Sequence, residues 1–590
     1  MLNITIRLQD AAAHLWQVTC AWQVAADAPQ QTVNLADWVP GSYMIRDFSR
    51  HIIRMQAFHN GHEIAIDALD KSRWHLQAAC GEYRLEYEVY AYDWSVRASY
   101  LDEQGAFFDG ACLFLSAQGR EHEPHQAVFE QLPESWQTAT TLPRLNAHTF
   151  QTASYAELID HPVELGQIEV LGFEAGGIAH RIALSGIYAD FDRERLISDI
   201  QKICRTELAM FPAPAPFKEY LFLLHLGDKI YGGLEHISST ALLADRNSLP
   251  AYGMNEAGDD YTQLLGLFSH EYFHAWNVKS IKPAAFVPYR LDSESYTEQL
   301  WAFEGITSYY DDLFLVQSGV IGTEAYLKLL AKALTRVQQN PGRLKQTLAE
   351  SSFTAWHKFY KQDENSPNAI VSYYQKGALA ALCLDLLIRQ KSGGAHSLAG
   401  VMQQHYRDWL ASGRGIAEQQ WQARCQAITG LDLHDFFQTA LYSTDDLPLE
   451  ACLQTAGIEL RWQALPRSHG GGLVETFAEQ TPATDLGARY KQNGSGITLT
   501  HVLNGSSAEQ AGLCPQDHII ALNGFACTDF DKQWAAFKAG EDIALHYFRH
   551  GVLRQTVLTV QNAAADTALL RIADTALLEQ WLTPNDGTGH

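Results

Sequence analysis

Several features that would place this chain in other classes of protein are missing from its 590 residues. No apolar run approaches the roughly 18 residues that a membrane-spanning helix needs, so we expect no membrane span. Basic residues are in the minority, with 43 Lys and Arg against 68 Asp and Glu. The resulting net charge of −25 argues against nucleic acid or an anionic membrane as a partner. With 46% hydrophobic residues, the composition predicts an acidic globular protein with substantial cores.

Cysteine is also sparse. The nine cysteines are scattered and form no C-x-x-C pair, which is typical of reduced thiols in protein cores rather than of a disulfide framework. The first residues show no basic stretch followed by an apolar one, so the sequence predicts no signal peptide. Together these features predict a cytoplasmic location.

The clearest chemical signal is the segment His270-Glu-Tyr-Phe-His274. Two histidines four residues apart share one helix face, so both imidazoles can reach one metal ion. Glu271 is displaced around the helix, where its carboxylate can act as general base on a metal-bound water. The simpler alternative is a pair of histidines hydrogen-bonded in a helical core. The motif favours a zinc hydrolase that holds one Zn²⁺ per chain.

A catalytic zinc site needs a third protein ligand, and Glu304 is the best candidate. It lies in an apolar stretch beside Trp301 and Phe303, where a carboxylate without a cation would be costly. Glu294 and Glu298 are rivals, but both lie in more polar sequence near the expected start of a helix, where acids suit the helix dipole.

The pattern of apolar residues divides the chain into a multidomain α+β protein. Alternating apolar and polar residues over 1–165 predict an antiparallel β domain. Residues 166–455 change from α/β to mostly helical patterning, with a buried strand near 219–226 and an edge strand over 232–239 lining a cleft. A strand lobe and a helical lobe on either side of the zinc helix form a thermolysin-like catalytic domain. We expect helices near 296–318, 323–339, 373–391 and 397–411 and, after about 563, an Ala/Leu-rich helical tail that ends at 590.

The chain resembles the gluzincin zinc peptidases, in which a Glu on a later helix is the third ligand. Gly232-Gly-Leu-Glu-His236 is similar to the G-x-M-E-N strand of aminopeptidase N. That resemblance implies that Gly233 and Glu235 bind substrate and that the Glu235 carboxylate holds its free α-amine. Tyr373-Tyr-Gln-Lys-Gly377 resembles the Y-E-K-G segment, which implies that Tyr374 stabilises the tetrahedral intermediate, with Tyr373 as the alternative.

The match is closer still to the glycyl aminopeptidase family, which also carries Trp-Asn-Val-Lys after the histidines, here Trp276 to Lys279. In that family a β domain packs beside the active site, so the turn Trp38-Val-Pro-Gly-Ser-Tyr43, followed by Arg46-Asp47, could border the cleft. A structural corner held by an Arg–Asp pair is the other interpretation of that turn. The sequence names no partner for the second nitrogen of either zinc histidine, because Ser308 stands where a thermolysin-type site has Asp.

Residues 470–562 resemble a bacterial-type PDZ domain. The run from Ser507 through Gly512 to Asn523-Gly524 predicts a short helix ending at a glycine and then a type I′ hairpin. Such a domain captures an extended peptide as an added strand, here in a groove beside Leu486, Gly487 and Ala488. The groove could instead be filled by the protein itself.

Taken together, the sequence predicts a zinc aminopeptidase that hydrolyses the N-terminal bond of peptides, and the resemblance implies a preference for Gly or Ala. Two other functions remain open. One is a zinc endopeptidase that recruits protein substrates through its PDZ domain. The other is a non-catalytic PDZ adaptor, against which the intact His/Glu set counts.

Overall fold

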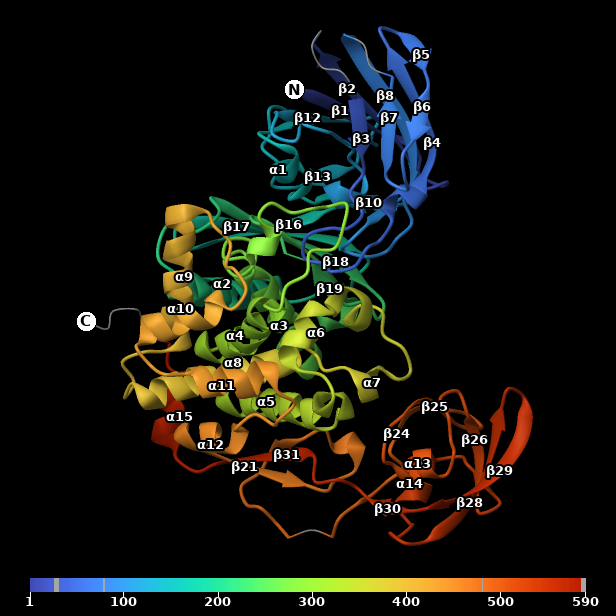
Figure 1. The fold of residues 1–590 in the computed structure, drawn as a ribbon, viewed down its shortest axis with the longest axis vertical. Helices are drawn as coiled ribbons and strands as arrows, with labels where there is room; N and C mark the ends of the chain where they lie inside the picture. Colours follow the sequence, from blue (N-terminus) through green and yellow to red (C-terminus); the bar gives the residue numbers. More distant parts are fainter. Residues whose placement is uncertain (26–30, 78–79, 480, 585–590) are drawn as a thin grey trace. The chain divides into compact units, whose positions relative to one another are not determined.

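The computed structural model describes residues 1–25, 31–77, 80–479 and 481–584. They form two compact units, which we describe separately (Figure 1). The first comprises Met1–Tyr296, Ser318–Val320 and Gln403–Ala417, and the second comprises the rest of the described chain. The zinc-motif helix therefore belongs to the first unit, and Glu304 belongs to the second.

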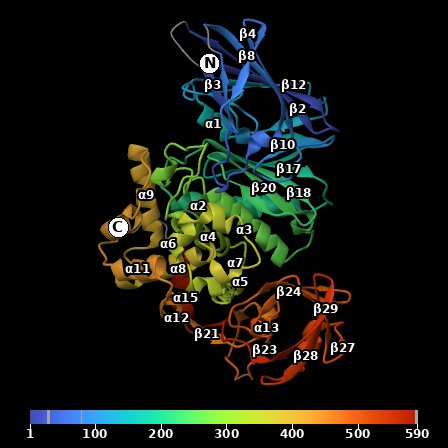
Figure 2. The same ribbon diagram turned by 45° about the vertical axis from the view of Figure 1, so that its right-hand side comes forward.

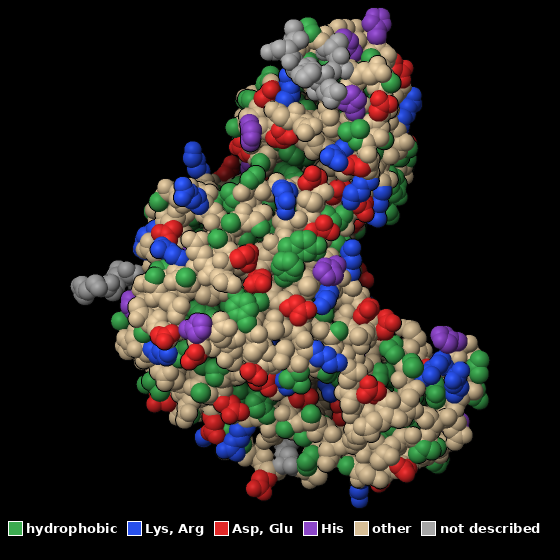
Figure 3. All heavy atoms as spheres, viewed as in Figure 1, with side chains coloured by type: hydrophobic (Ala, Val, Ile, Leu, Met, Phe, Trp, Pro, Cys, Tyr) green, Lys and Arg blue, Asp and Glu red, His purple; other side chains and the backbone are tan. Residues whose placement is uncertain are grey.

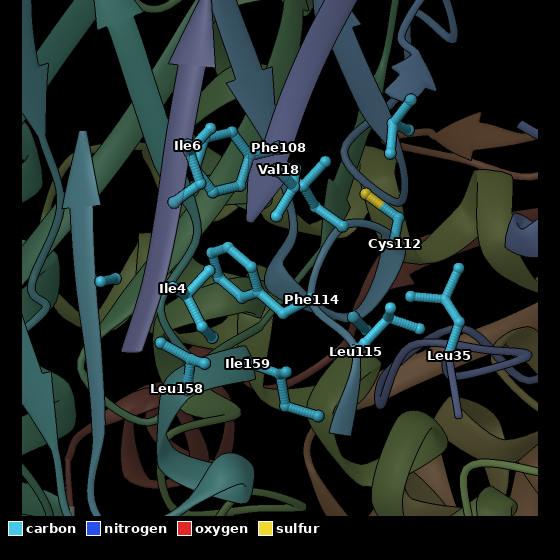
Figure 4. Packing of buried hydrophobic residues seen from close by; sticks show 14 of the residues in the cluster. Ile4, Ile6, Val18, Leu35, Phe108, Cys112, Phe114, Leu115, Leu158 and Ile159 are labelled. Carbon is cyan, nitrogen blue, oxygen red and sulfur yellow. The ribbon is translucent and has the colours of Figure 1, made fainter. Parts of the chain in front are cut away.

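The first unit begins with a β domain, as the alternating sequence predicts. Its largest sheet runs in the order β14 (Thr149–Thr152), β12 (His125–Glu130), β1 (Leu2–Asp10), β2 (Leu15–Val24), β8 (Gly81–Tyr90), β4 (Ile52–His59) and β5 (His62–Ile64). The pairing is antiparallel except between β1 and β12, which run parallel, so the expected antiparallel sheet is corrected at that position. The buried face of this sheet packs on α1 (Tyr155–Ile159) and on the segment that follows the 3-10 turn Gly110–Cys112. Figure 4 shows Ile4 and Val18 of the sheet together with Leu158 of α1 and Phe114 of that segment.

A second, mixed sheet of the first unit carries the candidate site. Its order is β16 (Glu169–Ala175), β17 (Ile178–Gly186), β18 (Glu219–Gly227), β20 (Ser239–Asp245) and β19 (Gly232–Glu235). The expected buried strand is the central β18, and the expected edge strand is β19, which ends four residues earlier than the sequence indicates. One face packs on the β domain through Phe107, Leu221 and Leu223. The other is covered by α2 (Arg193–Met210) and α3 (Asp259–Phe273) (Figure 2).

Helix α3 is apolar on almost every side because it is buried between the sheet and other parts of the chain. Its aromatic residues stack against the sheet, with ring centroids 5.0 Å apart for Phe268 and Phe222 and 4.7 Å apart for Tyr272 and Tyr220. His270 lies in the last turn of α3, and His274 follows as its C-cap residue. The packing of α3 therefore fixes where the two imidazoles can point.

The second unit begins with the helices that carry Glu304. A π-helical turn, Trp301–Gly305, leads into α4 (Ile306–Gln317), followed by α5 (Thr323–Gln338) and α8 (Gln375–Lys391). The helix expected from 296 starts later, because the Thr297 hydroxyl and the Glu298 amide donate hydrogen bonds to Glu418 instead of entering a helical turn.

The described C-terminal part of the second unit contains three further sheets. One has the order β24 (Ala488–Asn493), β25 (Gly496–Val502), β26 (His518–Leu522), β28 (Asp542–Arg549) and β29 (Val552–Thr559), and β27 (Phe525–Ala526) pairs with β26. The predicted short helix is α13 (Ser507–Gln510), followed by Gly512 in the left-handed region. Both Asn523 and Gly524 have positive φ between β26 and β27, as a type I′ hairpin requires.

The expected helical tail is corrected in part. Thr567–Ile572 forms strand β31, which pairs antiparallel with β21 (Ile458–Gln463), and only α15 (Thr575–Leu582) is helical. The Ala-Leu-Leu segment is buried because β31 is the middle strand between β21 and β22 (Gly472–Leu473), so pairing outweighs its helix propensity. Residues 585–590 lie outside the described part of the chain.

The surface is mixed in charge on the face that Figure 3 shows, where acidic and basic side chains are interspersed. No helix among the described residues is long and apolar enough to cross a membrane. All nine cysteines are free thiols, and seven of them are buried.

Candidate active site

The geometry of His270 and His274 suits one metal ion. Their Nε2 atoms lie 3.1 Å apart, and the two rings are nearly perpendicular, at 84°. Two nitrogens bound to one zinc at 2.0–2.1 Å in tetrahedral geometry would be about 3.3 Å apart. The donor atoms therefore already converge as the two histidine ligands of a zinc site do.

His274 is oriented by a backbone carbonyl that the sequence did not reveal. Its Nδ1 lies 2.7 Å from the carbonyl oxygen of Asn277, so the Nδ1–H donates and the Nε2 lone pair, on the side of His270, is the one that can bind a metal. This contact supplies the partner that the sequence left unassigned for one of the zinc histidines. Because the acceptor is backbone, no side-chain pattern could have predicted it.

The turn after α3 holds that carbonyl in place through an unusual backbone. Val278 has φ of 110°, a conformation that a β-branched residue adopts only when its surroundings impose it. Its amide donates to the carbonyl of Ile281, and the Lys279 amide donates to the carbonyl of His274, 3.0 Å away. The strained residue thus lies directly between the carbonyl that orients His274 and a buried lysine.

The candidate base, Glu271, lies against the edge strand of the mixed sheet. A Cβ built on Gly233 of β19 would stand 2.1 Å from Glu271 Oε1 and 2.4 Å from Cδ. Only a residue without a side chain leaves room for the carboxylate there. The structure thus places Gly233 in contact with Glu271, and the need for glycine at this position is steric.

Glu235 lies in the same group of side chains. Glu235, Glu271 and His274 each offer a donor atom, and these atoms all lie within 4.8 Å of one another. Glu235 is 4% exposed, and its Oε1 has no hydrogen-bond partner among the described residues. Two buried carboxylates this close repel each other unless a cation lies between them. The cluster is therefore suited to a metal ion, a substrate ammonium or both.

The β domain contributes to this site through Gly41. With φ of 100°, Gly41 adopts a conformation that favours glycine, and a Cβ there would stand 2.6 Å from Glu235 Oε2. Tyr43 is buried and stacks on Phe286, at 5.7 Å between ring centroids. The turn that the family resemblance placed beside the cleft thus contacts the Glu235 carboxylate. Arg46 donates to the Ser42 hydroxyl.

Behind Glu235 lies a buried network of charged side chains. Lys279 Nζ is 2.6 Å from Asp160 Oδ1, and His236 Nδ1 is 3.3 Å from the same oxygen. Burial raises the pKa of Asp160, but Lys279 and His236 outweigh it and hold the pKa below its usual range. Asp109 Oδ2 is 3.7 Å from His236 Nε2, and burial raises the pKa of Asp109 to about 6.

This network links the end of strand β19 to the end of helix α3. Asp160 Oδ2 also accepts a hydrogen bond from the amide of Ile237, in the turn that follows Glu235. The same carboxylate therefore contacts residues directly after β19 and, through Lys279, the turn directly after α3. His236, which stands where aminopeptidase N has Asn, is buried and contacts this network through its Nδ1.

The remaining candidates lie together in the second unit. Glu304 is 2% exposed, and a Cβ on its neighbour Gly305 would stand 2.6 Å from Gly377 Cα, so α8 approaches this turn closely. Burial, followed by Tyr360 and Glu304, raises the pKa of the Tyr373 hydroxyl well above its usual range. Tyr374 is partly exposed, and its hydroxyl lies 3.1 Å from that of Tyr360.

A His-Glu-x-x-His helix that packs on a mixed sheet, with its acid against an edge strand, is the arrangement of a zinc metallopeptidase. Comparison with known families agrees. Residues 263–380 match the model of the M61 glycyl aminopeptidases, and residues 3–167 match that of the M61 N-terminal domain. No curated protein matches the sequence.

Among solved structures, an aminopeptidase N family protein from Idiomarina loihiensis is 38% identical, covers 99% of this chain and 100% of its own, and superposes with a TM-score of 0.93. An M1 zinc metallopeptidase from Deinococcus radiodurans is 14% identical, covers 76% of this chain and 94% of its own, and has a TM-score of 0.47. The chain belongs to the M61 glycyl aminopeptidase family, and it is a zinc metallopeptidase.

Proposed function

We propose that this protein is an aminopeptidase that removes the first residue of peptides, with zinc held by His270, His274 and Glu304. These three side chains form one of two groups in the described part of the chain that could hold an ion. When bound, zinc would lower the pKa of a water molecule and polarise the scissile carbonyl. The converging imidazoles support the ligand set, and so does the burial of Glu304.

Glu271 is the proposed general base. Its carboxylate accepts a proton from the attacking water and passes it to the leaving amine. Contact with the Gly233 backbone restricts the carboxylate to one position, as an efficient base requires. Tyr374 is proposed to donate a hydrogen bond to the substrate carbonyl oxygen as negative charge develops there. Tyr373 is the alternative donor, and its full burial makes it the weaker candidate.

The single observation that carries the exopeptidase assignment is the unpaired Oε1 of Glu235. A buried carboxylate oxygen that lacks a donor costs free energy unless a ligand supplies one. A substrate α-ammonium would supply both the hydrogen bond and the opposite charge. Because Gly41 and the end of β19 enclose this carboxylate, little room remains for chain beyond the amine. The arrangement therefore favours removal of one residue at a time.

The test compares matched peptides with free and acetylated N-termini. Wild type should cleave the free peptide and barely cleave the acetylated one. Glu235→Gln should lose about 10–150-fold in kcat/KM on free peptides, because a charge-assisted hydrogen bond is worth about 1.5–3 kcal/mol. Equal cleavage of both peptides by wild type would refute the proposal and favour an endopeptidase.

The proposed ligand set has a separate test in the zinc content of the purified protein. His274→Ala and Glu304→Ala should each hold much less than the one zinc per chain expected of wild type. Glu298→Ala is a matched control, because Glu298 is the partly exposed rival of Glu304 on the same segment. Undiminished zinc in Glu304→Ala would remove that residue from the site.

We further propose a preference for N-terminal Gly or Ala. The family supports it, and so does the close approach of Gly41 to Glu235, which limits the space around a substrate amine. A series of Gly, Ala, Val and Leu anilides would test it. Equal kcat/KM across the series would contradict it.

The sheet β24–β29 is proposed to be a PDZ domain with a groove beside Leu486, Gly487 and Ala488. The short helix and the type I′ hairpin support the fold. An open groove has less support, because a side chain of the protein lies beside β24. The Tyr490 hydroxyl donates a hydrogen bond to Asp531, and its ring packs on Phe530 with centroids 4.9 Å apart. A peptide ligand should therefore bind Tyr490→Ala more tightly than wild type. The nine free thiols support a proposed cytoplasmic location.

A further inference from the structure

A large cavity lies on the face of the mixed sheet opposite to α3. It has a volume of about 730 Å³ and is enclosed by the β domain on one side and by β17, β18 and β20 on the other. That volume lies in the range of sites for small organic ligands. The cavity is separate from the candidate zinc site. Gly232 of β19 faces Val96, which lines the cavity, whereas the next residue, Gly233, faces Glu271. Successive residues of a strand point to opposite sides of the sheet, so the two sites lie on opposite sides of β19.

Aromatic rings form one wall and the mouth of this cavity. Tyr92 and Tyr100 stack at 5.2 Å between centroids, and Trp94 meets Tyr100 edge-on at 4.0 Å. Trp94 is 39% exposed and Tyr92 is 53% exposed, so both rings are accessible to a ligand in the cavity. Ring faces attract cations, which lie within about 6 Å of the centroid in such contacts.

The charges on the wall are almost all negative. Asp102, Glu103, Glu164 and Asp228 line the cavity, whereas Arg246 is the one Lys or Arg among its lining residues in the described chain. Asp102 already accepts hydrogen bonds from the Tyr100 hydroxyl and from two backbone amides, so it is structurally committed. An acidic rim by itself is often only a solvated surface.

Glu164 is different because it lies deep inside. It is 5% exposed, and among the described residues its carboxylate has an ion-pair contact with His225. The nearest basic group is His225 Nδ1, which is 3.6 Å from Oε1, beyond hydrogen-bond range. That nitrogen is instead 2.8 Å from the Ser185 hydroxyl oxygen. Because Glu164 lines the cavity, a cationic donor that enters there can pair with this carboxylate.

We propose that this cavity binds an organic cation, with an ammonium or guanidinium group at Glu164 and its apolar body against Trp94 and the tyrosines. The cation completes the hydrogen bonding of Glu164, and the exposed rings lose contact with water when it enters. The cation is either a free small amine or the side chain of a Lys or Arg residue in a peptide. Both present the same chemistry to the cavity, and neither depends on the zinc reaction.

Calorimetric titration of the full-length chain tests this proposal. A Glu235→Gln background should weaken binding of an amine at the candidate active site by about 10–150-fold, which separates the two sites. We expect 2-phenylethylamine to bind once per chain and its neutral counterpart 2-phenylethanol to bind at least tenfold more weakly. N-acetyl-lysine amide and N-acetyl-arginine amide form the second arm. Binding of these amides shows that a peptide side chain can be the cation, and binding of phenylethylamine alone restricts it to a free amine.

Glu164→Gln should weaken binding of the cation by about 10–100-fold, as loss of a charge-assisted hydrogen bond does. Glu103→Gln is the matched control, since it removes the same charge from an exposed position on the rim. Trp94→Leu should also weaken binding of the cation. It replaces Glu164→Gln as the test if that variant does not fold. Equal binding of the amine and the alcohol would overturn the proposal, as would equal losses in Glu164→Gln and Glu103→Gln.

Discussion

Gly233→Ala is a small change that should disable the base without touching a metal ligand. The new Cβ would stand 2.1 Å from Glu271 Oε1, 2.4 Å from Cδ and 2.6 Å from Cγ. The shortest of these distances falls short of ordinary contact by about 1.3 Å. Because Tyr272 and Phe268 pack α3 tightly on the sheet, the helix cannot retreat, and the carboxylate must swing away.

The expected cost follows from what the base contributes. General acid–base catalysis is worth about 10²–10⁴-fold, and a misplacement of about 1 Å can cost 10²-fold. Gly233→Ala should therefore lower kcat/KM on a glycyl anilide by about 10²–10⁴-fold, or about 3–5 kcal/mol of transition-state stabilisation. The loss should fall mainly on kcat, and zinc content should stay near that of wild type.

Gly232→Ala is a control from the adjacent position. Its Cβ would stand 3.7 Å from Arg97 Nη1 and 3.9 Å from Val96 Cγ2, which are ordinary contacts on the other side of β19. Both variants change the strand propensity of β19 equally, so the difference between them isolates the clash with Glu271. Activities of the two variants within twofold of each other would refute the reasoning. So would loss of zinc or of folding in Gly233→Ala, measured by metal analysis and thermal unfolding.

Four further outcomes are expected. His270→Ala should lose zinc, whereas Glu271→Gln should keep it and lose about 10²–10⁴-fold in kcat, as metal analysis and steady-state kinetics would show. Tyr374→Phe should lower kcat more than it raises KM, and the reverse pattern would assign it to substrate binding. Asp160→Asn leaves the buried Lys279 ammonium without its charged partner. It should lower the free energy of unfolding in urea by about 3–5 kcal/mol, whereas Asp→Asn at an exposed position should not. Because the pKa of Asp109 is raised to about 6, the folded state retains a proton there that the unfolded state releases above about 3.8. The stabilisation that this proton provides is thus full below pH 3.8 and lost as the pH rises to 6. Over that window the free energy of unfolding of wild type should fall by about 3 kcal/mol relative to that of Asp109→Asn.

The parts of the fold that sequence predicts well are those with a strong local period. Alternation over Gly81–Tyr90 gives β8, and the apolar run Glu219–Gly227 gives the central strand β18. The spacing of the two histidines predicts their shared helix face, and the structure brings their Nε2 atoms to 3.1 Å. In each case the periodicity reflects which side of the element is buried, and this is a local property of the chain.

Predictions from local pattern failed where distant residues compete with it. Residues 567–572 have good helix formers, yet they pair with 458–463, more than 100 positions away. The segment before Trp301 is helix-like in sequence, but Glu418 takes its hydroxyl and amide donors. Neither partner can be identified from one sequence, because the pairing depends on tertiary structure rather than on propensity.

The same limit applied to the candidate site. The Pro-Gly pair at 40–41 predicts a turn, but nothing local indicates that the turn meets Glu235. Asn277 belongs to the Trp-Asn-Val-Lys motif, but it orients His274 through its backbone carbonyl and not through its side chain. Such contacts are set by the positions of whole elements. Motifs therefore indicate the groups proposed to do chemistry and miss the contacts that orient them.

Asp160 shows why this distinction matters for catalysis. It comes from the β domain, which has no reactive group at the site, but its carboxylate contacts the turn after β19 and, through Lys279, the turn after α3. The first of these turns follows the proposed amine ligand, Glu235, and the second carries the carbonyl that orients His274. A rigid tie between them fixes the distance from substrate amine to zinc ligand, on which removal of a single residue depends. On the proposed mechanism the β domain would therefore help to build the active site, even though it contributes no residue to the reaction.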